Sequence, residues 1–140
     1  MSELRPFHLA IPVNDLKAAR HFYGQILGFS EGRCDTQWID WNFYGHQVVT
    51  HLNPNHRPEN YCNEVDAHSV PIPHFGVVLT IEDWKILAKK MKQHAVKFII
   101  EPYLRFEGEP GEQATMFFLD PSGNALEFKA FKTLEGLFAH

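Results

Sequence analysis

Hydrophobic and polar positions alternate along residues 6–13, which have the sequence PFHLAIPV. One side of this alternation carries only large apolar residues: Phe7, Leu9, Ile11 and Val13. The other side carries His8 and Ala10. Because successive side chains of a strand point to opposite faces, the pattern predicts a β-strand with one buried face and one face of small or polar residues.

Apolar residues recur at helical spacing through residues 14–28, so this segment is predicted to form an amphipathic helix. Asn14 or Asp15 can cap the start of the helix, and Gly28 can end it. Strand-type patterns follow, in which the last two segments form a hairpin. The three strands are expected over residues 29–35, 38–44 and 47–52.

The same order of patterns returns in the second half of the chain. Residues 73–79 alternate again, with His74 and Gly76 on the face away from the large apolar residues. A helix with a capping-box start is predicted over residues 80–94. The repeat is completed by predicted strands in residues 96–103 and by a hairpin over residues 115–131.

The chain therefore reads strand, helix and three strands, twice, and this repeat predicts an α+β fold in a single domain of residues 1–140. Module one covers residues 5–53 and module two covers residues 72–132. Residues 54–71 are polar and rich in proline, so they are predicted to be a linker or surface loop. Each module is expected to present a sheet face that must be covered by the other module.

Composition narrows the classes of function. Hydrophobic residues make up 44% of the 140 residues and charged residues 21%, which allows a substantial core. The net charge is −4 and no Lys/Arg run occurs, which argues against nucleic-acid and anionic-membrane binding. No segment of signal-peptide or membrane-spanning type occurs. Cys34 and Cys62 lack CxxC spacing, so we expect free thiols in a reducing cytoplasm.

Three residues of metal-binding type fall at matching positions of the two modules. His8 and His74 occupy the same step of the first strand of each module, 66 residues apart. Glu127 lies in the last strand of module two, where His51 is expected to occupy the same step of module one. If the two sheets curve toward each other, His8, His74 and Glu127 can converge on a divalent metal that keeps open coordination positions. His51 is the candidate fourth ligand.

Each of these residues also has a simpler interpretation. A single histidine in a strand is more often a hydrogen-bonded core or surface residue than a metal ligand. Glu127 would be a solvent-facing residue at a sheet edge, in keeping with Lys129 two positions further along. The joint pattern in two repeats, on the faces away from the large apolar residues, favours the metal site.

Further side chains are candidates for catalysis and substrate binding. Arg105 suits a carboxylate or an enolate, and it stands with Tyr103 and Phe106 before a loop rich in Gly and Pro. His46 and Phe106 are further candidates for substrate binding, and Tyr44 and Tyr103 are candidates for catalysis. A surface role for Arg105 and a core role for most aromatic residues are the alternatives.

The segments FHLAIPVNDLKAARHFYGQILGF, PHFGVVL and FFLDPSGNALEFKAF resemble the vicinal oxygen chelate superfamily. This superfamily includes glyoxalase I, fosfomycin and bleomycin resistance proteins, and extradiol dioxygenases. The string GEPGEQATMFFLDPSGNALEFKAF is most similar to small proteins described as predicted extradiol-type dioxygenases. The resemblance covers nearly the whole chain.

The resemblance implies paired βαβββ modules that form a cup around a metal. It assigns His8 and His74 as the histidine ligands and Glu127 as the carboxylate ligand. In glyoxalase I the last strand of the first module supplies a glutamate as fourth ligand, where we place His51 in this chain. His51 is therefore either a fourth ligand or an acid/base group near the metal.

The function expected from the triad and the resemblance is an extradiol-type dioxygenase that acts on a small catechol-like substrate. Fe(II) is the first choice of metal, and Zn, Ni or Mn are the alternatives. The alternative functions are a glyoxalase-type isomerase or lyase and a non-catalytic small-molecule binding protein. A symmetric homodimer is the expected assembly.

Overall fold

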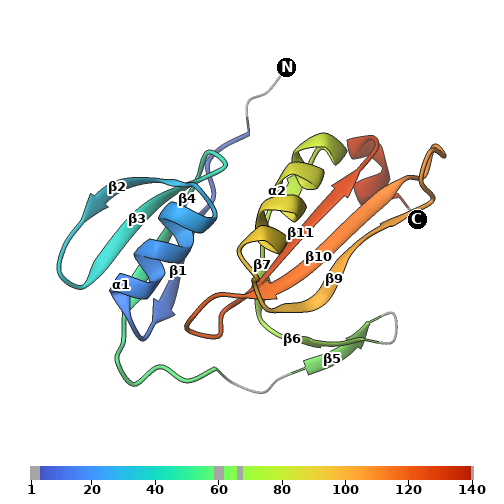
Figure 1. Cartoon of the computed structure of the whole chain (residues 1–140). Coiled ribbons are helices and arrows are strands. Elements are labelled where there is room, and N and C mark those ends of the chain that lie inside the picture. The colour runs from blue at the N-terminus through green and yellow to red at the C-terminus, as the bar shows by residue number, and fades with distance from the viewer. Residues whose placement is uncertain (1–3, 59–61, 66–67, 140) are drawn as a thin grey trace. The chain divides into compact units, whose positions relative to one another are not determined.

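The computed structural model describes residues 4–58, 62–65 and 68–139, and the chain divides into two compact units (Figure 1). The first unit comprises Met1–Pro58 together with Asp120–Asn124. The second unit comprises Glu59–Leu119 and Ala125–His140. Each unit contains one mixed sheet and one main helical segment, so the prediction of an α+β fold with two βαβββ-like modules is confirmed.

The first unit holds a four-stranded sheet in the order β1-β4-β3-β2. Its strands are β1 (His8–Val13), β2 (Ser30–Cys34), β3 (Trp38–Phe43) and β4 (His46–Leu52). β1 runs parallel to β4, and the other neighbours are antiparallel. Ile11 and Val13 are buried whereas His8 and Ala10 are exposed, as the alternation predicts, although Phe7 is 64% exposed and lies outside the core.

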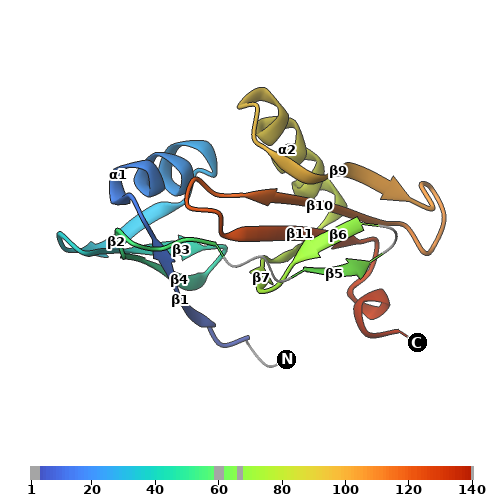
Figure 2. The ribbon, with the colours of Figure 1, turned by 90° about the horizontal axis from the view of Figure 1, so that it is seen from below.

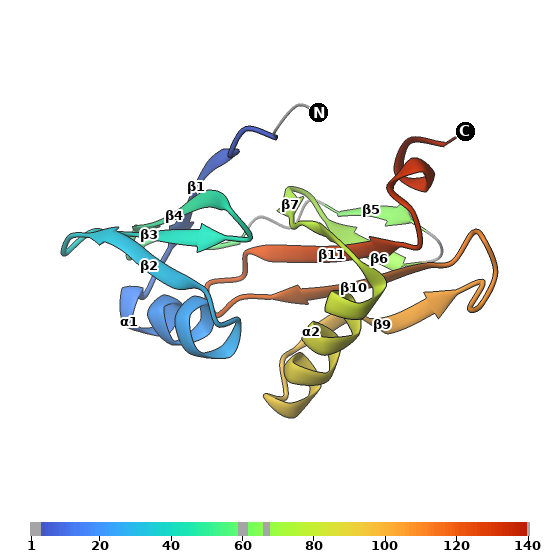
Figure 3. The ribbon, with the colours of Figure 1, turned by 90° about the horizontal axis from the view of Figure 1, so that it is seen from above.

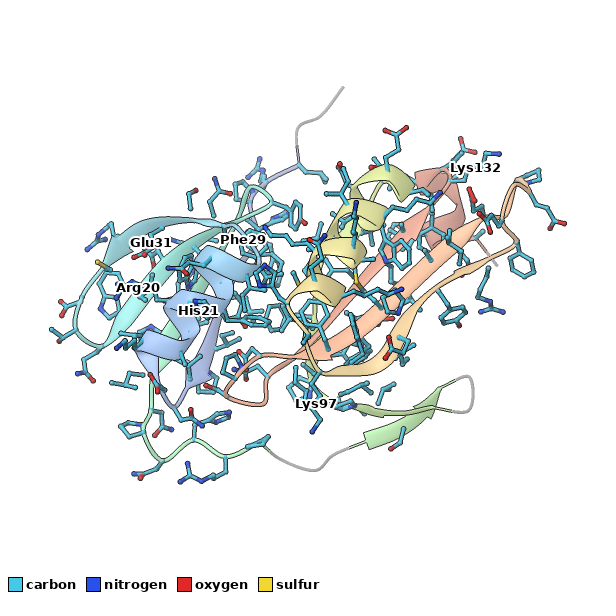
Figure 4. The ribbon with its side chains drawn as sticks, viewed as in Figure 1. Arg20, His21, Phe29, Glu31, Lys97 and Lys132 are labelled. Carbon is cyan, nitrogen blue, oxygen red and sulfur yellow. The ribbon has the colours of Figure 1, made fainter. Side chains whose placement is uncertain are left out.

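The helical segment of the first unit has two parts. α1 (Leu16–Ala19) begins at Asp15, whose carboxylate accepts a hydrogen bond from the Ala18 amide at 3.0 Å. The chain continues as a π-helix, η1 (Arg20–Ile26), which the periodicity of the sequence did not predict. On the exposed side the Arg20 guanidinium donates two hydrogen bonds, of 3.0 and 3.2 Å, to Glu31 of β2 (Figure 4).

The second unit holds a sheet in the order β7-β11-β10-β9, with β8 also paired to β11. Its strands are β7 (His74–Phe75), β8 (Val78–Leu79), β9 (Phe98–Arg105), β10 (Gln113–Leu119) and β11 (Ala125–Phe131). Helix α2 (Ile81–Gln93) covers one face of this sheet, where the Trp84 indole N–H donates to the Phe128 carbonyl at 3.0 Å. A short 3-10 helix, η2 (Leu134–Phe138), follows the last strand.

The strand predicted over residues 73–79 is broken into β7 and β8, and the break has a steric cause. A Cβ built on Gly76 would lie 1.6 Å from the carbonyl oxygen of Glu127. The backbone at Gly76 therefore passes directly against the backbone of β11. Only glycine allows this approach, so the continuous strand is wrong at this position.

The segment predicted as an irregular linker contains a hairpin made of β5 (Cys62–Val65) and β6 (His68–Pro71). This hairpin and α2 lie on opposite sides of the second sheet (Figure 2 and Figure 3). Val70 is 4% exposed and belongs to a buried cluster with Ile100, Phe117 and Ala125. The linker prediction was wrong here because polar residues and prolines obscured a short strand that gains its stability from packing on the sheet.

The turn Asp120–Asn124, which joins β10 to β11, packs within the first unit around a buried carboxylate. Asp120 is 5% exposed, and the Tyr23 hydroxyl donates to it at 2.7 Å. The backbone N–H groups of Ser122 and Asn124 each donate to the same carboxylate at 2.9 Å. Burial raises the pKa of Asp120 above its ordinary value, although these hydrogen bonds oppose the rise. Burial also raises the pKa of Tyr23, which stays a donor.

The same turn is bonded to the end of β1 and to the start of the helical segment. The backbone N–H of Asn14 donates to the Ser122 hydroxyl at 3.0 Å. The side-chain amide of Asn124 donates to the Pro12 carbonyl at 2.8 Å. The Asp-Pro-Ser-Gly-Asn sequence is therefore more than a tight turn, because its polar side chains bind Pro12, Asn14 and Tyr23 of the first unit.

Two smaller predictions concern membranes and thiols. In the part of the chain that the structure describes, no helix is long and apolar enough to cross a membrane. Cys34 is a free, exposed thiol, as expected. The side chain of Cys62 lies outside the described residues, so its predicted free state stays a prediction.

Tyr23→Phe is expected to lower the free energy of unfolding by about 1–2 kcal/mol at neutral pH, because the buried Asp120 carboxylate loses a donor. Loss of that donor raises the pKa of Asp120 further. The loss of stability is therefore complete above this raised pKa. It shrinks as the pH falls through that pKa, because the Asp120 carboxyl then becomes neutral in both proteins. Urea unfolding from pH 7 down to about pH 4 measures the effect.

A matched control is Tyr44→Phe, because Tyr44 is 41% exposed and should change stability by less than about 0.5 kcal/mol. A cost for Tyr23→Phe that does not depend on pH would contradict the role assigned to Asp120.

Candidate metal centre

His74 and Glu127 lie side by side in the second unit. β7 runs parallel to β11, and the register pairs His74 with Ala125, so Glu127 is two residues further along the same face. The distance between His74 Nε2 and Glu127 Oε1 is 3.5 Å. β11 lies between β7 and β10, and the Glu127 side chain is only 16% exposed, so the interpretation of Glu127 as a solvent-facing edge residue is wrong.

Both side chains of this pair are oriented by further hydrogen bonds. His74 Nδ1 lies 2.7 Å from the Pro71 carbonyl oxygen, which can only accept, so we assign the ring proton to Nδ1. The lone pair of Nε2 then faces Glu127. The Thr115 hydroxyl donates to Glu127 Oε2 at 2.7 Å, which leaves Oε1 facing His74. Such outer hydrogen bonds are typical of metal-ligating histidines and carboxylates.

The pair fits a bound cation. With the proton on Nδ1, an imidazole lone pair and a carboxylate oxygen face each other, and this contact is repulsive unless a second proton or a metal ion lies between them. The 3.5 Å separation is longer than the 2.7–2.9 Å usual for a charge-assisted hydrogen bond. It is close to the roughly 3.4 Å expected between two ligands that each lie about 2.1 Å from a tetrahedral ion.

His8 is held in the same way in the first unit. Its Nδ1 lies 2.7 Å from the side-chain oxygen of Gln47, its register partner in β4. When Gln47 presents its oxygen, His8 carries its proton on Nδ1 and its Nε2 lone pair is available for a metal. Within residues 4–58, 62–65 and 68–139, no three His, Cys, Asp or Glu side chains gather into a metal-binding group. The predicted triad therefore stays a prediction.

The strand registers correct the position expected for His51. In the second unit, Glu127 lies two residues beyond the register partner of His74. In the first unit, the residue two beyond the register partner of His8 is Val49. The step of Glu127 is thus occupied by Val49, and the prediction that His51 shares this step is wrong by two residues.

His51 is also far from His8. It pairs with Pro12 and lies four residues beyond Gln47, the register partner of His8. Four residues of a strand span roughly 13 Å, and side chains stand roughly perpendicular to a sheet, so the two imidazoles leave the sheet well apart. Strand pairing is a non-local property, and for this reason the local pattern around His51 did not reveal the offset.

A cavity of about 240 Å³ opens beside His74 and Glu127, entirely within the second unit. Its apolar wall includes Val70, Ile100 and Phe117. Its polar wall includes Tyr103, Arg105, Thr115 and Lys129. Tyr103 and Arg105 were predicted from the sequence. Thr115 was missed, although the alternation of β10 places it on the same face as Phe117.

The remaining predicted residues do not line this cavity. His46 belongs to the first unit, where its Nδ1 accepts a hydrogen bond from the Phe7 amide at 2.8 Å. Tyr44 has φ 53° in the turn between β3 and β4. Phe106 is 50% exposed, and the Arg105 guanidinium lies 5.4 Å from the centre of its ring. Their roles in catalysis or substrate binding stay predictions.

Comparison with known proteins gives a family model and several solved structures. The model of the Glyoxalase/Bleomycin resistance protein/Dioxygenase superfamily matches residues 5–128. A crystal structure of a glyoxalase/bleomycin resistance protein/dioxygenase from Alicyclobacillus acidocaldarius is 35% identical, with 96% of each chain covered and a TM-score of 0.76. No curated protein matches the chain.

Two more distant structures share the fold. A glyoxalase/dioxygenase from Nostoc punctiforme is 18% identical over 94% of this chain and 97% of that chain, with a TM-score of 0.68. The fosfomycin resistance protein FosX from Listeria monocytogenes is 18% identical over 97% of this chain and 98% of that chain, with a TM-score of 0.66.

Gly76→Ala is expected to lower the free energy of unfolding by at least about 1–3 kcal/mol, because the new Cβ would collide with the Glu127 carbonyl. β7 would have to move away from β11, so the His74–Glu127 pair should separate as well. Gly111→Ala is the matched control, since nothing lies within 4 Å of a Cβ at that position. Thermal unfolding of both variants tests this, and equal stability would contradict the close approach.

Proposed function

The chain belongs to the glyoxalase/bleomycin resistance protein/dioxygenase superfamily, and we propose that it is a metal-dependent enzyme whose substrate offers two adjacent oxygens to the metal. Many members of this superfamily are metal-dependent enzymes. The observation that carries the proposal is the contact between His74 Nε2 and Glu127 Oε1, two acceptors 3.5 Å apart at the side of a cavity.

His74 and Glu127 are the proposed ligands in the second unit, and His8 is the proposed third ligand. The support for His8 is its orientation, because a neighbouring oxygen binds Nδ1 of His8 just as one binds Nδ1 of His74. His8 is supplied either by the same chain or by a second copy in a symmetric homodimer, which is the proposed assembly. Fe(II) is the proposed metal, with Zn, Ni or Mn as alternatives.

An extradiol-type dioxygenase agrees better with this ligand set than a glyoxalase-type isomerase or lyase does. Val49 occupies the step in β4 that corresponds to Glu127, and a valine cannot supply the fourth protein ligand that the glyoxalase I resemblance requires. Two histidines and one carboxylate leave several positions open, as in Fe(II) oxygenases. The bound metal would supply Lewis acidity toward the two substrate oxygens and redox chemistry with O₂.

The residues around the cavity would bind and orient the substrate. The apolar wall of Val70, Ile100 and Phe117 suits a flat ring, and the volume of about 240 Å³ fits a small molecule. Thr115 fixes the orientation of the Glu127 carboxylate through its 2.7 Å hydrogen bond. Tyr103 is the phenol of the polar wall, so we assign it as the candidate proton donor or acceptor in place of His51.

Substitution of the proposed ligands is expected to abolish metal binding. His74→Ala, Glu127→Gln and His8→Ala should each lower the affinity for Zn(II) or Fe(II) by at least about 100-fold, because the alanines remove a donor atom and Glu127→Gln removes the negative charge of the carboxylate. His51→Ala should leave affinity unchanged, since His51 lies four residues beyond the register partner of His8. His21→Ala, on the exposed helix surface, is the control.

Elemental analysis of anaerobically purified protein gives the metal content, and calorimetry gives the affinity. Retention of metal by Glu127→Gln, or loss of metal in His51→Ala, would contradict the proposed ligand set.

The Fe(II)-loaded protein is expected to convert a catechol into a yellow ring-fission product, with one O₂ consumed for each product formed. A catechol panel followed by absorbance and an oxygen electrode measures this, and Glu127→Gln is the inactive control. Activity on a hemithioacetal without O₂ would indicate the isomerase instead. If the protein with verified iron turns over no catechol, the dioxygenase proposal fails.

A further inference from the structure

The charge of the cavity differs in sign from the charge of the whole chain. The chain has a net charge of −4. Among the residues that the structure describes, the Arg, Lys, Asp and Glu residues that line the cavity are Arg105, Lys129 and Glu127, so in this part of the chain cations outnumber the carboxylate. A divalent metal beside Glu127 would make the cavity more positive. A positive cavity in an acidic protein concentrates and binds anions.

The strand registers place these charges in order along the cavity. Three rows of side chains cross β9, β10 and β11, and they are Ile100–Phe117–Glu127, Tyr103–Thr115–Lys129 and Arg105–Gln113–Phe131. Successive rows lie two residues apart along β10, which is about 7 Å. The row with the proposed metal ligand is otherwise apolar, and the cations stand in the second and third rows.

The side chain of Arg105 is suited to a planar anion. Its guanidinium carbon lies over the Phe106 ring, 5.4 Å from the ring centre. A guanidinium presents N–H donors in its plane that match both oxygens of a carboxylate. Phe106 holds a left-handed backbone with φ 57°, which is costly for an aromatic residue and is tolerated most often near functional sites.

We propose that the substrate is an aromatic diol with a carboxylate on a short side chain, and that Arg105, assisted by Lys129, binds this carboxylate. The diol would lie at the row of Glu127 and the ring on Phe117, so that the side chain points along the rows toward Arg105. The inference rests on the proposed function, since the diol end of the substrate is placed by the proposed metal. It adds a substrate class and an anchor residue.

The test compares the affinities of Zn(II)-loaded protein for two ligands of the same shape. Zn(II) has no redox chemistry, so the ligands are not oxidised during the measurement. The ligands are 3-(3,4-dihydroxyphenyl)propanoate and its uncharged amide, titrated by calorimetry. The acid is expected to bind about tenfold more tightly than the amide. Arg105→Gln should lower the affinity for the acid by about that factor and leave the affinity for the amide unchanged. Lys129→Gln should have a smaller effect in the same direction.

Lys97→Gln is the matched control, because Lys97 is an exposed cation of the second unit that does not line the cavity (Figure 4). Its affinity for the acid should equal that of the unsubstituted protein. Thermal unfolding checks that Arg105→Gln is folded, which its exposed position leads us to expect. The preference for the acid should also weaken as salt is added.

The outcomes separate this inference from the proposed function. Equal affinity for acid and amide, or an acid preference that survives Arg105→Gln, overturns the carboxylate site and leaves the metal site standing. If neither ligand binds the Zn(II)-loaded protein, the proposed function fails. In that case the carboxylate site is tested without the metal, by titration of 3-phenylpropanoate into metal-free protein. Binding that is lost in Arg105→Gln supports the carboxylate site, and the absence of binding overturns it.

Discussion

The candidate site depends on one steric constraint, the contact between the backbone at Gly76 and the backbone at Glu127. The Cβ of any other residue would lie 1.6 Å from the Glu127 carbonyl oxygen, so the first strand of the second module can run this close to β11 only because residue 76 is glycine. This approach interrupts the strand, sets His74 beside Glu127 and leaves an imidazole nitrogen facing a carboxylate oxygen. The charge arrangement that favours a metal is thus a result of backbone packing.

A second constraint acts in the first unit and involves a buried acid. Asp120 is almost fully inaccessible to water, yet its carboxylate accepts hydrogen bonds from Tyr23, Ser122 and Asn124. These hydrogen bonds offset much of the free-energy cost of burying the carboxylate, although the pKa of Asp120 still rises. The turn that joins β10 to β11 is therefore held at the end of β1 by polar contacts. A feature that the sequence presents as turn chemistry has a structural function in the core.

Local patterns predicted the elements well and the pairing between them poorly. The alternation around His8 and His74 assigned the correct faces, because a strand exposes its period within a few residues. The offset of His51 from the step of Glu127 depends on how β4 pairs with β1, and no local signal reports that register. The hairpin within the predicted linker was missed for a related reason, because Val70 acquires its burial from Phe117 and Ile100 rather than from its own neighbours. His74, Glu127, Tyr103 and Arg105 were predictable from local patterns, whereas the contact of Thr115 with Glu127 depends on how β10 pairs with β11.

The hairpin formed by β5 and β6 connects the size of the cavity to the orientation of the histidine. Val70 forms part of the apolar wall, and the next residue, Pro71, holds the Nδ1 proton of His74 through its carbonyl oxygen. A bulky guest that displaces Val70 would shift this carbonyl and rotate the imidazole away from Glu127. Val70 and Pro71, two adjacent residues outside the main sheet, thereby couple the size of a bound molecule to the orientation of the His74 ring. Substitutions in this hairpin would therefore alter which molecules fit the cavity while His74 and Glu127 stay unchanged.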